Sequence, residues 1–243
     1  MAPNASQMTS QIRYVSNRLK DGWLMVKPES GPNVSIPSYL KVSVYKEEPD
    51  RSYFVVLEGV HKGKRMSVTR AGASPNRIQG IVHSPAGIVR LNRTQQKLWY
   101  GSNGPYFAFS GTWGTYTAIK HGRYTLQIPE APHLSNRYGG FTSFQNTWFL
   151  IMGNGVGPKD GRYLHVGELS DGCVTVRAFV LDPKATTQPP NFTDWANVPD
   201  SNLGGFGYPY PPTPAPLASW TDIYNYLINS RLSDQSVGTL VVE

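Results

Sequence analysis

The sequence has only one cysteine, Cys173, among its 243 residues. A single cysteine forms no intramolecular disulfide, and no Cys/His cluster has the spacing of zinc ligands. A chain of this length buries a core without such supports, so we expect no metal and no cofactor. Cys173 is therefore either a small buried apolar side chain or a reactive thiol.

Long apolar runs are also missing. Residues 1–30 contain no stretch that would serve as a secretory signal, and nowhere do eighteen apolar residues follow one another. A membrane-spanning helix needs a run of about that length. We therefore expect no integral membrane segment, and no export by the general route unless a signal has been removed.

Negative charge is in short supply. Lys and Arg number 23 against 16 Asp and Glu, which gives a net charge of +7. This balance favours an anionic neighbour. The basic residues are scattered and form no dense stripe or arm, so we expect no nucleic acid partner, whereas an anionic cell envelope suits a diffuse positive surface.

Turn-forming residues are abundant, with 24 glycines and 20 prolines between short apolar stretches. This rhythm predicts a mostly β protein of the β-sandwich or barrel type. Two composition shifts divide it into an N-terminal β-rich portion, 1–75, and a second unit, 76–243. The Pro/Gly-rich insertion 182–218 excludes regular structure, and apolar residues at helical spacing predict one C-terminal amphipathic helix over 219–232.

Short apolar runs bounded by turn residues mark the expected strands. They cover 40–45, 52–57, 66–69, 80–83, 88–92, 98–100, 106–110, 123–128, 147–152, 163–166, 174–180 and 239–242.

The segment 161–180 is the most informative part of the chain. Two runs that alternate apolar and polar residues flank the turn-forming letters GELSDG, which predicts an antiparallel hairpin centred near Leu169. The polar face of that hairpin would carry Tyr163, His165, Cys173, Thr175 and Arg177. Of these, we expect Tyr163, Thr175 and Arg177 to contact substrate.

His165 and Cys173 each lie four positions from the centre of this expected hairpin. Directly opposed residues have Cβ atoms about 4.5–5.5 Å apart, so the local sequence predicts a thiol–imidazole dyad. An adjacent imidazolium would lower the pKa of the thiol, and the imidazole would later protonate a leaving amine.

Neighbouring residues would support this dyad. Gly172 lets a substrate carbonyl approach, and the amides of Gly172 and Cys173 would form an oxyanion hole. A backbone carbonyl, Ser170, Asp171 or Glu168 would orient His165, and the sequence leaves these alternatives open. The alternative is that His165 lies beside a semi-buried Cys173 by chance and that neither residue is catalytic.

The order His165-x-Gly167 followed by Ser170-x-Gly172-Cys173-Val174 resembles the signature of the L,D-transpeptidase (YkuD-like) family. The resemblance covers roughly residues 78–181. It departs from the family in three ways. The spacing from histidine to cysteine is about half the usual length, Asp171 stands where histidine is frequent, and Thr175 stands where arginine is frequent, so that Arg177 would supply the guanidinium.

The resemblance implies a mechanism and a place of action. Cys173 would attack the carbonyl between an L-centre and a D-centre of a peptidoglycan stem tetrapeptide, and the acyl group would pass to an amine or to water. The chain would then act in the periplasm or cell envelope as a transpeptidase or carboxypeptidase. Delivery by a specialised secretion machinery, as an antibacterial effector with an immunity protein as partner, accounts for the missing signal.

Other interpretations remain at this point. His133 lies in a polar, turn-rich stretch and would either line a substrate cleft or face solvent in a loop. The alternative function is a non-catalytic cell-wall or carbohydrate-binding β module, which the tyrosines and positive charge favour. A structural envelope or phage-associated protein with a decayed site is the third hypothesis.

Overall fold

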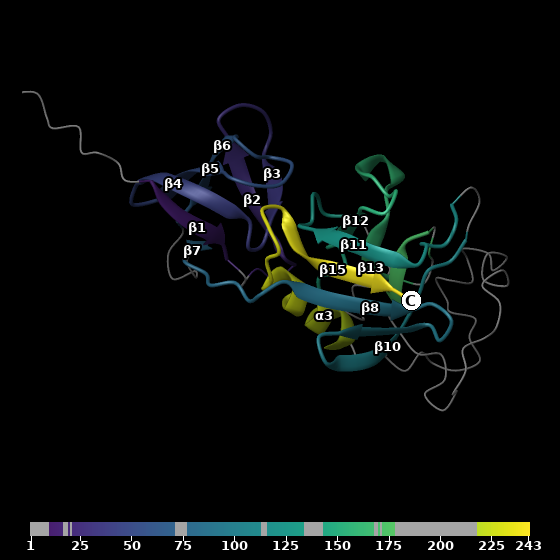
Figure 1. Cartoon of the computed structure of the whole chain (residues 1–243). Coiled ribbons are helices and arrows are strands. Elements are labelled where there is room, and N and C mark those ends of the chain that lie inside the picture. The colour runs from purple at the N-terminus through teal and green to yellow at the C-terminus, as the bar shows by residue number, and fades with distance from the viewer. Residues whose placement is uncertain are drawn as a thin grey trace, which may run out of the picture.

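Two β-sheets from successive parts of the chain lie side by side (Figure 1). The computed structural model describes residues 10–16, 19, 21–70, 77–112, 116–133, 143–167, 170, 172–177 and 218–243. The fold is mostly β, as predicted, and the second sheet is a barrel.

The first sheet has seven strands in the order β3-β2-β6-β5-β4-β1-β7 and curls into a half-barrel. Its strands are β1 (Gln11–Val15), β2 (Trp23–Pro28), β3 (Val34–Pro37), β4 (Lys41–Glu47), β5 (Arg51–Val56), β6 (Arg65–Thr69) and β7 (Ile78–Gln79). Alternate residues of β4 and β5 are buried, so each strand turns one face to the core and one outward.

The second sheet is a closed barrel of eight strands in the order β10-β14-β13-β12-β11-β15-β8-β9, in which β9 pairs with β10. The strands are β8 (Gly87–Asn92), β9 (Lys97–Tyr100), β10 (Asn103–Phe109), β11 (Gly122–Gln127), β12 (Phe149–Met152), β13 (Tyr163–Gly167), β14 (Val174–Arg177) and β15 (Ser236–Val242). A short 3-10 helix, η1 (Pro158–Asp160), precedes β13. Closure leaves no unpaired edge in this sheet.

The predicted C-terminal helix is α3 (Ala218–Ile228), which ends four residues before the predicted limit. The chain leaves the helix because Ser230 bridges to Ser84 and residue 236 already begins β15. Trp220, Tyr224 and Leu227 are buried and belong to the apolar cluster that includes both sheets. No helix in the described part of the chain is long and apolar enough to cross a membrane.

Polar contacts join the first sheet to the chain around α3. Glu58, 1% exposed, accepts hydrogen bonds from the backbone amides of Lys41 and Gln235 at 2.8 and 3.3 Å. Arg231 pairs with the same carboxylate at 3.4 Å. The chain passes from sheet to barrel between β7 and β8, near the expected boundary at residue 75, but whether each sheet is a separate domain stays a prediction.

Candidate functional site

The expected antiparallel hairpin over 161–180 is wrong, because β13 and β14 run parallel. Two described residues of the link between them, Ser170 and Gly172, contact Gly111, the second residue after β10. The Gly172 amide donates to the Gly111 carbonyl at 3.1 Å, and the Gly111 amide donates to the Ser170 hydroxyl at 3.1 Å. Since β14 lies between β13 and β10, these contacts lie on the β10 side of β14.

Parallel pairing changes which residues face one another. The register places His165 opposite Thr175, whereas the Tyr163 amide donates to the Cys173 sulfur at 3.4 Å. Cys173 immediately precedes β14, and its sulfur lies against the main chain of β13 at Tyr163, two residues before His165. That both side chains share one face stays a prediction. The residue directly across from His165 is therefore Thr175 and not Cys173.

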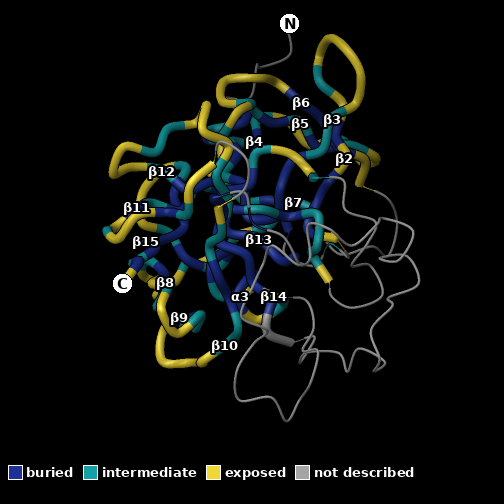
Figure 2. The backbone as a smooth tube through the Cα atoms, turned by 90° about the vertical axis from the view of Figure 1, so that its right-hand side faces the viewer, coloured by how far each residue is buried: buried dark blue, intermediate teal, exposed yellow. Residues whose placement is uncertain are grey.

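Burial defines the state of His165, which is 7% exposed on a strand that is largely dark blue in Figure 2. Its Nδ1 lies 3.0 Å from the Val166 carbonyl, which only accepts, so Nδ1 carries the proton. Nε2 then accepts from the Thr175 hydroxyl at 3.2 Å. Burial lowers the pKa of His165 to about 4, so the imidazole is neutral at neutral pH.

This geometry answers the question of what orients the imidazole. Among the alternatives left open by the sequence, the structure has a backbone carbonyl, that of Val166, at Nδ1. The Ser170 hydroxyl instead donates to the Cys173 carbonyl at 2.7 Å and so shapes the link before β14. Glu168 and Asp171 lie outside the described residues.

Cys173 is a buried thiol, 7% exposed. Its sulfur accepts the Tyr163 amide and lies 3.9 Å from the Gly161 carbonyl, toward which the thiol donates. A substrate carbonyl therefore has little access to the sulfur in the described conformation.

Trp148 is a residue that the sequence analysis missed. Its ring stacks on His165 with centroids 4.3 Å apart and on His133 with centroids 4.2 Å apart. Trp148 precedes β12, whose antiparallel register with β13 pairs Leu150 with Tyr163 and so brings Trp148 beside His165. Only this non-local register would have revealed it.

His133 and Tyr163, both predicted to contact substrate, meet at this cluster. Their rings pack edge to face with centroids 4.8 Å apart. The Tyr163 hydroxyl donates to Glu130 at 2.7 Å, and burial together with this bond raises the pKa of Tyr163. Burial lowers the pKa of His133. The structure thus links the rings of His133 and His165 through Trp148, which stacks on both. The sequence alone assigned His133 only to a polar, turn-rich stretch.

Gly172 has a structural role in the described conformation. Its φ of +74° is in the left-handed region, and a Cβ there would lie 2.7 Å from the Thr117 carbonyl oxygen. Arg162 closes the same corner by donating to the carbonyls of Thr117 and Gly172 at 2.7 and 3.1 Å. Because its amide already bonds Gly111, Gly172 does not direct that amide at a substrate here.

Gly167 makes room for the imidazole. A Cβ at this position would lie 3.3 Å from Cε1 of His165 and 3.4 Å from Cγ2 of Thr175. Packing against the imidazole therefore explains the glycine in the sequence His165-x-Gly167. Arg177 pairs in register with Gly167, but its side chain lies outside what the structure describes.

Among the described residues, no group of three or more His, Cys, Asp or Glu side chains could hold a metal ion. The insertion 182–218 lies outside the described residues except for Ala218. Comparison with known proteins gives no family: no family model, curated protein or solved structure matches the chain.

Proposed function

We propose that the chain is a cysteine acyltransferase of the cell envelope, an L,D-transpeptidase or L,D-carboxypeptidase that acts on peptidoglycan stem tetrapeptides. The observation that carries the proposal is the position of the Cys173 sulfur, which lies 3.4 Å from the Tyr163 amide on β13, the strand that also carries His165. His165 is unprotonated at neutral pH, as a general base must be, but burial lowers its pKa to about 4, so the proposal requires that substrate binding raise this pKa toward the working pH. The substrate class rests on the resemblance of the motif.

In the first step, the Cys173 thiol gives its proton to Nε2 of His165, and the sulfur attacks the carbonyl carbon that precedes the terminal D-residue. The C–N bond breaks, a thioester to Cys173 forms, and His165 passes the proton to the amine of the departing residue. Because Nε2 accepts from Thr175 in the described conformation, the imidazole must exchange this hydroxyl for the thiol.

In the second step, an amine or water attacks the thioester. His165 takes the proton of the nucleophile and returns it to the sulfur, which restores the thiol. An amine acceptor gives a 3,3-type cross-link or exchange of the terminal residue, and water gives carboxypeptidase action. Tyr163, His133 and Arg177 are the proposed substrate contacts, and Thr175 is a positioning residue for the imidazole.

The proposed place of action is the periplasm. The net charge of +7 suits an anionic envelope. Delivery by a specialised secretion machinery, with an immunity protein as partner, is part of the same proposal.

The second candidate is a non-catalytic cell-wall or carbohydrate-binding β module. The low exposure of Cys173 and the bond between Nε2 of His165 and Thr175 argue against catalysis. The net charge of +7 favours binding to an anionic wall polymer. In that case the cysteine is a packing residue, and its removal changes no activity.

The deciding experiment is mass spectrometry of purified stem tetrapeptide fragments incubated with the protein, with and without an added D-amino acid. We expect wild type to remove or exchange the terminal residue, and Cys173→Ala and His165→Ala to lose at least about a thousandfold in rate. His121→Ala is the matched control and should keep the wild-type rate, because it removes an exposed histidine outside this site and leaves Cys173 and His165 unchanged. Absence of product with folded wild-type protein would leave the binding module as the better description.

A further inference from the structure

The outer face of the first sheet carries a row of polar side chains that crosses four strands. The registers pair Lys27 of β2 with Ser67 of β6, Ser67 with Tyr53 of β5, and Tyr53 with Lys46 of β4. Adjacent strands are about 4.8 Å apart, so the row is about 14 Å long with a lysine at each end. We call these four residues the basic row.

A β-bulge in β4 shapes one end of the row. The pairing of β4 with β5 shifts between Val44 and Lys46, so Tyr45 is the extra residue. A bulge of this kind re-aims side chains and turns Tyr45 and Lys46 toward the same surface. The Lys46 ammonium lies 5.1 Å from the Tyr53 ring centroid, and the Arg65 guanidinium lies 5.4 Å from that of Tyr45.

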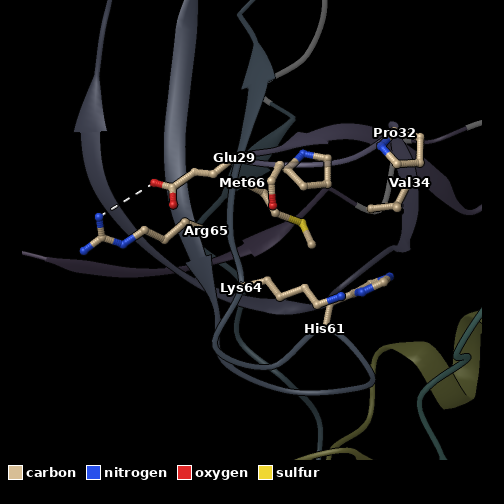
Figure 3. A pocket seen from close by; sticks show the side chains of 9 residues that line it. Glu29, Pro32, Val34, His61, Lys64, Arg65 and Met66 are labelled. Carbon is tan, nitrogen blue, oxygen red and sulfur yellow. Dashed lines mark ion pairs between the residues drawn. The ribbon is translucent and has the colours of Figure 1, made fainter.

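The basic row forms the floor of a hollow of about 550 Å³, which also has Arg51 and Arg65 in its lining. Ser67 lies 8% exposed at the bottom and accepts a hydrogen bond from Arg51 at 2.8 Å. A second hollow of about 350 Å³ adjoins the first through shared residues, among them Arg65 (Figure 3). There Lys64 and His61 lie opposite Pro32 and Val34 (Figure 3).

The charge of the two hollows is predominantly positive. Their lining contains five permanent cations and one carboxylate, Glu29, which lies 3.7 Å from Arg65. Glu48 adds a second carboxylate beside Lys46. The five cations are Lys27, Lys46, Arg51, Lys64 and Arg65. An anionic ligand therefore has partners over the whole length of the surface.

We propose that this surface binds an extended glycan that bears carboxylates, and that it holds the protein on the cell-wall polymer on which the proposed enzyme acts. The inference thus rests on the proposed function for the identity of the polymer. Ser67 and Tyr53 lie between the terminal lysines in the register. The Tyr53 hydroxyl donates to Glu48 at 2.9 Å, so toward a sugar hydroxyl it acts as an acceptor.

Nucleic acid fits this surface less well. Proteins that bind single-stranded nucleic acid combine cations along its backbone with aromatic rings on which successive bases stack. The rings of Tyr45 and Tyr53 are 6.4 Å apart and tilted by 46°, and each already has a cation over it. The tyrosines therefore contribute packing and hydroxyl groups to the hollow, and the cations contribute the recognition.

The test is co-sedimentation with insoluble, purified cell wall in a Cys173→Ala background, which separates binding from turnover. We expect the triple variant Lys27→Gln/Lys46→Gln/Arg65→Gln to bind about tenfold less than its parent. The matched control is Arg90→Gln/Lys120→Gln/Lys159→Gln, which removes the same charge from exposed positions outside the first sheet. This control should bind like the parent.

The outcomes separate this inference from the proposed function. Equal binding by both triple variants, or tighter binding of a single-stranded oligonucleotide than of cell wall, would overturn the inference. With Cys173 restored, the first triple variant should process soluble tetrapeptide fragments at the wild-type rate. Selective loss of wall binding supports the inference even if no turnover is found, in which case only the catalytic proposal fails.

Discussion

The polar side chains of the candidate site in the barrel are buried, whereas those of the basic surface on the first sheet are largely exposed. In the barrel, His165 and Cys173 are each 7% exposed, and burial controls the protonation of the imidazole. On the first sheet, the side chains of Lys46 and Arg65 are 49% and 61% exposed, and water screens their charges. The first arrangement suits proton transfer at a dry site, and the second suits reversible attachment to a charged polymer.

Loss of an ion pair should lower the free energy of unfolding much more when the pair is buried than when it is exposed, and this is the largest effect that we expect. Glu58 is 1% exposed and pairs with Arg231, whose pKa burial lowers. Glu58→Ala would leave that guanidinium and two backbone amides without the carboxylate, so we expect a loss of about 2–4 kcal/mol in the free energy of unfolding. Urea denaturation measures this loss.

Glu47→Ala is the matched control for this experiment. Glu47 pairs with Arg13 at 3.2 Å on the solvated side of the same sheet, and its side chain is 35% exposed. Its removal should change the free energy of unfolding by less than about 0.5 kcal/mol. Equal losses for both variants would contradict the contrast between buried and exposed pairs.

The second expected effect is a pH dependence of the free energy of unfolding that arises from His165. Its pKa is about 4 in the folded protein against an ordinary value of 6.5, so the unfolded chain binds a proton first as pH falls. Stability should therefore decrease between pH 6.5 and 4, by up to about 3 kcal/mol from this residue. Unfolding titrations at pH 7 and 4.5 would show a smaller decrease for His165→Gln.

His121→Gln is the control for the pH experiment, since His121 is an exposed histidine of the barrel. Its pH profile should match that of wild type. A residual decrease is expected in every variant, because burial also lowers the pKa of His83 to about 4. Parallel profiles for wild type and His165→Gln would show that the imidazole is hydrated.

Alternation along the chain predicted most of the barrel, because those strands have one apolar face. Runs such as 88–92 and 123–128 correspond to β8 and β11. The same rule missed β2, in which Met25 is 58% exposed and Pro28 ends the strand, and it missed β1 and β3. Residues 80–83 are not a strand, since the chain there connects the two sheets.

The candidate site shows where local sequence stops being informative. Alternation correctly predicted the strand that contains His165 and the strand that follows Cys173, because the side-chain period of a strand is local. It gave the wrong strand direction, because β14 also pairs with β10, where Phe109 meets Thr175. Trp148 escaped notice for the same reason: its place beside His165 depends on pairing between β12 and β13.

The smallest effect is expected on the exposed sheet, where Lys46 interacts with Glu48 and with the Tyr53 ring. The ammonium lowers the pKa of Glu48 through their hydrogen bond. In Lys46→Gln the pKa of Glu48 should therefore rise toward its ordinary value, which NMR titration of the carboxyl carbon measures. The melting temperature should stay within about 1 °C of wild type, because solvated pairs contribute little to stability. A large drop in melting temperature would instead show that Lys46 stabilises the fold. Stability would then explain the cations of the basic row, and they would no longer be evidence for a ligand.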